Sequence, residues 1–141
     1  MENLATDFHY FVIETHSSNS QTTMKNFKKL VIWQKGMRIV ELTYRMTDAF
    51  PASEKFGLTS QCQRAGVSIP SNIAEGSSRK STKDELRFME IALGSSFELE
   101  TQTLIAKMRN YSTPETITSL LDEIDQEQRM IMSYMEKINP K

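Results

Sequence analysis

Apolar residues recur every three or four positions over most of this chain, which is the period of helices with one buried face. Between capping and breaking residues, the pattern predicts four helices, over residues 28–49, 59–75, 82–110 and 114–138. Pro51 ends the first helix. Ser81 with Asp84, or Thr82 with Glu85, forms a capping box for the third, and Thr113 followed by Pro114 begins the fourth. The chain is therefore expected to be all-α.

The second helix contains a proline within its apolar stripe. The stripe consists of Leu58, Cys62, Ala65, Ile69 and Ile73 and continues in register past Pro70. A proline inside a helix removes a backbone hydrogen bond at a cost of about 3 kcal/mol, so tertiary packing has to offset that loss. A loop over Ser68–Asn72 is the alternative. We predict a helix kinked at Pro70 by more than about 20°, ending at Gly76 as a C-terminal cap.

Two helices carry apolar residues on more than one face. On the first helix, the predicted core stripe is Leu30, Trp33, Met37, Val40 and Tyr44. A second set falls on roughly the opposite side and is predicted to be an oligomer interface: Ile32, Ile39, Leu42 and Met46. The third helix repeats this double pattern, and Gly66 and Gly94 indicate close helix crossings. Scattered surface apolar residues are the alternative. The pattern favours a homo-oligomer.

The first 23 residues differ from the rest. They carry an acidic, aromatic segment around Phe8–Ile13, followed by a linker rich in Ser, Thr, Asn and Gln. We expect residues 1–23 to be a flexible N-terminal extension that folding does not require, and residues 24–141 to be the bundle domain. In the alternative, the apolar cluster docks on a neighbouring surface. The sequence leaves open whether Met1 or Met24 is the natural start.

Three separated blocks carry a family resemblance: FKKLVIWQKGMRIVELTY, RAGVSIPSNIAEGSSRKS and RFMEIALGSSFELETQ. Together they resemble the bacterial proteins encoded in intervening sequences of 23S ribosomal RNA genes, over about residues 24–138. The resemblance implies an up-down-up-down four-helix bundle, a closed ring of five subunits and no established activity. Distant relatives include the accessory protein of diversity-generating retroelements, which implies nucleic acid and a reverse transcriptase as possible partners. This chain resembles that branch less, because its charge is more balanced.

The amino-acid composition argues against several classes of function. Lys and Arg total 17 against 18 Asp and Glu, so the chain lacks the strong basic excess typical of nucleic-acid-binding proteins. Both histidines, His9 and His16, precede the bundle, which excludes the Glu-x-x-His pairs of di-iron bundles. The acidic clusters, including Asp122–Glu127, are interpreted as hydrated faces, so no metal or other cofactor is expected. We predict a non-enzymatic protein without a membrane span or signal peptide, located in the cytoplasm.

Charge is nevertheless unevenly distributed. Residues 25–110 carry fourteen bases and nine acids, whereas residues 111–141 carry three bases and six acids. The turn before the third helix places cations beside free backbone N–H groups and the positive end of a helix dipole, an arrangement that favours phosphate. The candidate nucleic-acid-binding residues are Arg79, Lys80 and Lys83, supported by Arg64 and Arg87. We therefore expect weak binding of RNA or single-stranded DNA; the alternative is a protein–protein scaffold.

Overall fold

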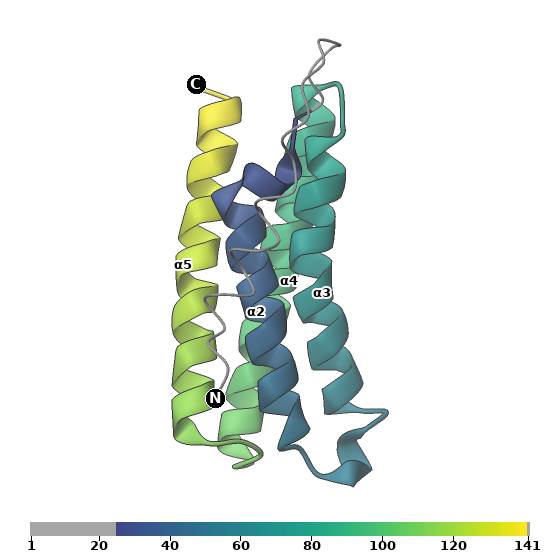
Figure 1. Ribbon diagram of the computed structural model, residues 1–141, viewed down its shortest axis with the longest axis vertical. Helices are drawn as coiled ribbons and strands as arrows, with labels where there is room; N and C mark the ends of the chain where they lie inside the picture. Colours follow the sequence, from purple (N-terminus) through teal and green to yellow (C-terminus); the bar gives the residue numbers. More distant parts are fainter. Residues whose placement is uncertain (1–24, 141) are drawn as a thin grey trace, which may run out of the picture.

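The computed structural model describes residues 25–140, and the predicted N-terminal extension, residues 1–23, lies outside the described residues. Four long helices form the bundle in Figure 1: α2 (Val31–Asp48), α3 (Leu58–Ser77), α4 (Thr82–Met108) and α5 (Pro114–Ile138). Two short 3-10 turns, η1 (Phe27–Lys29) and η2 (Ala52–Glu54), precede α2 and α3. The predicted helices are confirmed to within three residues at each end.

The helices alternate in direction, so that α2 and α4 run opposite to α3 and α5 (Figure 1). Each helix packs on the next, and α5 returns to pack on α2. The helix starts agree with the predicted caps: the Ser81 side chain accepts from the Asp84 N–H, and the Thr113 side chain accepts from the Thr116 N–H. The all-α, up-down-up-down four-helix bundle is thus confirmed.

The predicted core face of α2 is wrong. The four residues assigned to an oligomer interface, Ile32, Ile39, Leu42 and Met46, are buried in the core of the single chain. Met37 and Tyr44, assigned to the core, are exposed, whereas Trp33 is buried as expected. The reason is helix approach: Gly36 and Thr43 lie on the same side as Ile39, and these small residues let α2 come close to α3.

Pro70 lies inside the continuous helix α3, where it is buried. A Cβ built on Gly36 of α2 would lie 3.2 Å from the Cβ of Pro70, so the proline packs against the one residue of that turn without a side chain. This apolar contact helps to offset the missing N–H. The loop alternative is therefore wrong, because the helix continues to Ser77, while the bend angle at Pro70 stays a prediction.

Gly76 does not end α3. It lies within the helix, and no glycine among residues 25–140 has a positive φ. A Cβ on Gly76 would lie 2.7 Å from the Cβ of Phe88 on α4, which is too close for any real side chain. Gly76 therefore serves close packing of α3 against α4 rather than reversal of the chain direction.

Candidate nucleic-acid interface

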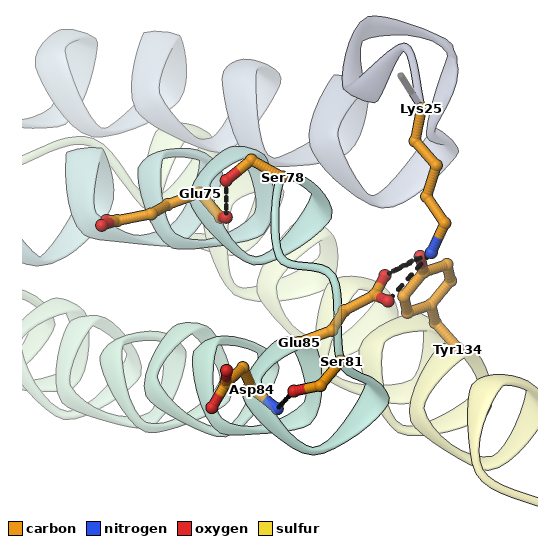
Figure 2. Close-up of polar contacts among 7 residues, drawn as sticks. All are labelled: Lys25, Glu75, Ser78, Ser81, Asp84, Glu85 and Tyr134. Carbon is orange, nitrogen blue, oxygen red and sulfur yellow. Dashed lines mark hydrogen bonds and ion pairs between the residues drawn. The ribbon is translucent and has the colours of Figure 1, made fainter. Parts of the chain in front are cut away.

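The turn from α3 to α4 brings together the densest group of predicted site residues. Side chains close the turn at both ends: Ser78 Oγ donates to the Glu75 carbonyl (2.6 Å), and Ser81 Oγ accepts from the Asp84 N–H (3.2 Å), as Figure 2 shows. The first of these bonds covers a carbonyl at the end of α3, and the second caps the start of α4. Serines at these two positions therefore serve the local structure.

Two of the cations are partly engaged within the chain. Arg79 pairs with Glu75 one turn earlier (3.0 Å), and its guanidinium lies 4.7 Å from the centre of the Phe88 ring. The Arg87 guanidinium lies 5.5 Å from the centre of the same ring. Such stacking holds both arginines beside one aromatic side chain and leaves N–H groups at their edges for other acceptors.

Lys80 and Lys83 are the freer cations of the turn. Both are exposed, and neither forms an ion pair or hydrogen bond among the described residues. They lie at the beginning of α4, where unpaired N–H groups and the helix dipole favour an anion. An exposed lysine held by no neighbour keeps its charge available to a phosphate at little cost in broken contacts.

Acidic side chains already occupy part of this helix start. Asp84 and Glu85 lie in the first turn of α4, and Glu85 is only 3% exposed. Its carboxylate accepts from Lys25 Nζ (2.9 Å) and from Tyr134 Oη (2.6 Å), as Figure 2 shows. Burial, with the Glu85 hydrogen bond, raises the pKa of Tyr134, so this hydroxyl stays a donor. These carboxylates reduce the attraction of the helix start for phosphate.

Arg64 belongs to a different surface. It is exposed near the middle of α3 and lines two hollows together with Ser60 and Ser68. It precedes Arg79 by fifteen residues, which corresponds to about 22 Å along a helix. The structure therefore brings together Arg79, Lys80, Lys83 and Arg87 around one turn, and separates Arg64 from them.

Asp122 and Asp125 of α5 are exposed, as the predicted hydrated face requires, but Glu123 and Glu127 of the same cluster are not. Glu123 accepts from Lys35 (2.7 Å) and Arg38 (3.0 Å) of α2. Burial opposes ionisation of Glu123, but these hydrogen bonds and charges outweigh it and lower the pKa. Three or more His, Cys, Asp or Glu side chains that could hold a metal ion do not come together anywhere in residues 25–140.

Glu127, which the sequence analysis placed on a hydrated face, is instead the chemically distinctive residue of α5. It is fully buried, and neither carboxylate oxygen has a hydrogen-bond partner among the described residues. Burial raises its pKa to about 8, with Glu123 adding to the effect and Lys35 opposing it. A signal existed in the sequence: positions 117, 120, 124, 127 and 131 follow one helical stripe, which is otherwise apolar.

An exposed apolar stripe runs along the outer side of α4. Its members leave between 37% and 73% of their surface exposed: Ile91, Phe97, Leu104, Ile105 and Met108. A Cβ built on Gly94, within the span of this stripe, would meet no atom within 4 Å. The close crossing predicted at Gly66 is confirmed, since its Cβ would lie 3.2 Å from Thr43 Oγ1, but within the described chain none exists at Gly94.

Known proteins share this fold. The family model for the 23S rRNA-intervening sequence protein matches residues 28–133. A crystal structure from Bacteroides thetaiotaomicron VPI-5482, described as a protein with unknown function from the S23 ribosomal protein family, aligns with a TM-score of 0.70 at 22% identity, covering 75% of this chain and 99% of that one. No curated protein gives a significant match. Among the described residues, no helix combines the length and apolarity needed to cross a bilayer. This chain belongs to the 23S rRNA-intervening sequence protein family.

Proposed function

We propose that this protein is a homo-oligomer that binds RNA or single-stranded DNA weakly and without strong sequence preference. The observation that carries the binding proposal is the pair Lys80 and Lys83, exposed and unpartnered within the described chain at the start of α4. Arg79 and Arg87, both stacked on Phe88, extend the positive surface. Four cations against Glu75, Asp84 and Glu85 make a modest site, so the affinity of one subunit is low.

The exposed residues of α4 support the proposed self-association, and self-association would in turn strengthen binding. The outer stripe of α4 leaves five large apolar side chains exposed, and covering such a stripe is favourable. An oligomer also repeats the Lys80 and Lys83 site in every subunit, which raises the overall affinity for a long polyanion. The stoichiometry of five is the one that the family resemblance implies. We assign the interface to α4, because the residues first expected to form it, on α2, are buried in the single chain.

The binding proposal is tested by the double variant Lys80→Ala with Lys83→Ala. We expect its affinity for fluorescent single-stranded RNA, measured by anisotropy, to fall about tenfold or more at about 50 mM salt for every sequence tried. The slope of log affinity against log salt should become shallower by about 0.7 for each phosphate that the variant no longer neutralises on a single strand. A uniform decrease across sequences is expected because phosphate contacts carry no base information.

A matched control is Lys107→Ala, which removes one exposed lysine at the opposite end of α4. Its affinity and salt slope should equal those of the parent protein. If the double variant binds as tightly as the parent, or if the intact oligomer shows no binding at about 50 mM salt, the nucleic-acid proposal is wrong. The α4 stripe would then favour the alternative function, a protein–protein scaffold.

A further inference from the structure

A hollow of about 430 Å³ lies between the beginning of α2 and the last turns of α5. Its floor is apolar and contains Leu30, Ile32 and Met130, and Val31 at its edge is 60% exposed. The charged residues that line it are all cations: Lys29, Arg129 and Lys137. This combination fits a segment that carries both apolar and acidic side chains.

Two of these cations are available to such a segment. Arg129 is paired with Asp125 one turn earlier on α5. Lys29 and Lys137 have no ion pair or hydrogen bond among residues 25–140. A carboxylate entering the hollow therefore meets two uncompensated positive charges beside an apolar floor.

The chain itself enters beside this hollow. Lys25, the first residue described, is fixed by its bond to Glu85, and Tyr134, which donates to the same carboxylate, also lines the hollow (Figure 2). Lys25 therefore joins the preceding part of the chain to the bundle near a residue that lines the hollow. A tethered segment has a high effective concentration and needs little intrinsic affinity to bind.

The sequence of residues 1–24 is complementary to the hollow. It contains three acids, Glu2, Asp7 and Glu14, and no Lys or Arg. Between the second and third acids lies the apolar cluster Phe8, Tyr10, Phe11, Val12 and Ile13. The chain from Glu14 to Lys25 spans up to about 38 Å when extended, which is enough to reach any turn of α5.

We propose that residues 7–14 of the same chain bind in the hollow between α2 and α5. Their apolar side chains cover the floor formed by Leu30, Ile32 and Met130, while Asp7 and Glu14 face Lys29 and Lys137. The binding is independent of the nucleic-acid proposal, because the α3–α4 turn contributes no residue to the hollow. Binding in the hollow would also remove the aromatic side chains of this segment from water.

Hydrogen exchange on the full-length protein tests the contact. In the parent, amides of residues 7–14 should be protected by about tenfold or more over an unstructured peptide. Reversing the lysines, with Lys29→Glu and Lys137→Glu together, should remove that protection, because it places acids opposite acids. Adding Asp7→Lys and Glu14→Lys to this variant should restore it. The matched control, Lys80→Glu with Lys107→Glu, makes the same charge change away from the hollow and should leave the protection unchanged.

Carbodiimide cross-linking gives a second, chemical readout. The reagent joins a carboxylate and a lysine in direct contact, so the expected products are amide bonds between Glu14 or Asp7 and Lys29 or Lys137. In a mixture of ¹⁴N- and ¹⁵N-labelled protein, these bonds should connect peptides of the same isotope. Unprotected amides at residues 7–14 in the parent, protection that survives the lysine reversal, or products that connect different isotopes would each overturn the proposal.

Discussion

Glu127 is the one side chain in the described part of the chain with two buried oxygens that both lack a hydrogen-bond partner. Its carboxylate lies on the inward face of α5 without a hydrogen-bond partner there. The charged groups that act on it are Lys35 on α2, which favours the ionised form, and Glu123 on α5, which opposes it. With the pKa raised to about 8, the side chain is mainly neutral at pH 7, and its ionisation is coupled to unfolding.

Glu127→Gln should therefore make stability less dependent on pH. In the folded parent the pKa is raised above the ordinary 4.5, so the contribution of Glu127 is fully present below about pH 4.5 and is lost as the pH rises toward about 8. The variant should match the parent near pH 5 and exceed it at pH 8 by on the order of 2 kcal/mol. Urea denaturation at both pH values measures this.

A neighbouring acid supplies the control for this comparison. Burial notwithstanding, Lys35 and Arg38 lower the pKa of Glu123, so its contribution to stability is present at neutral pH and is lost as the pH falls. Glu123→Gln should therefore be less stable than the parent at neutral pH, with a difference that shrinks in acid. If the difference between Glu127→Gln and the parent is the same at pH 5 and pH 8, Glu127 is ionised in the folded state.

At the scale of helices, glycines decide how closely the elements approach. Gly36 meets Pro70, Gly66 meets Thr43 and Gly76 meets Phe88, so α3 lies close to both α2 and α4. Gly94 differs because the space around its missing side chain is open within the described chain. A glycine inside a helix costs about 1 kcal/mol relative to alanine, and at Gly94 no contact within the described chain offsets that cost.

Alanine substitution should separate these two classes of glycine. Gly76→Ala places a Cβ 2.7 Å from that of Phe88 and should lower the free energy of unfolding by about 1–3 kcal/mol. Gly94→Ala should raise it by about 0.5–1 kcal/mol, when the two are compared in urea at equal protein concentration. If Gly94 lies in a subunit contact, the same variant should weaken association, measured by analytical ultracentrifugation. Stabilisation by Gly76→Ala would contradict close packing of α3 on α4 at this position.

At the scale of the whole molecule, burial distinguishes core residues from candidate subunit contacts. Ile39 on α2 has no exposed surface, whereas Phe97 on α4 leaves 48% of its surface exposed. Both are apolar residues on helices with two apolar faces, so the sequence pattern alone does not show which of them is buried in the core. Their responses to an added charge should therefore differ in kind.

Phe97→Glu should dissociate the proposed oligomer and leave the fold intact, because the new carboxylate stays in water on the free subunit. Ile39→Glu should unfold the bundle, because it puts a charge without a partner into the core. Light scattering reports the mass, and circular dichroism reports helix content. A parent mass of one chain at micromolar concentration would refute the oligomer, and an intact oligomer in the Phe97→Glu variant would exclude α4 as its interface.

Prediction from the sequence succeeded where local signals decide structure and failed where two helix faces had to be compared. Helix ends followed from Ser81, Thr113 and Pro114, whose effects act within a few residues. The role of Gly76 was missed because the same residue type serves as a helix cap or as a close contact, and only its distance to Phe88 distinguishes them. Four of the five candidate cations share one turn because they are near in sequence, whereas the separation of Arg64 depends on helix geometry.

By itself, the sequence determined the all-α class, the four helices and their boundaries, because helical periodicity and capping depend on neighbours along the chain. The tertiary structure alone decided which stripe of α2 faces inward, through the contacts of Gly36 with Pro70 and of Thr43 with Gly66. It also decided that Glu127 is buried and that the α4 stripe is left exposed. The physical reason is that burial depends on how closely the helices can pack, which depends on residues far apart in the chain.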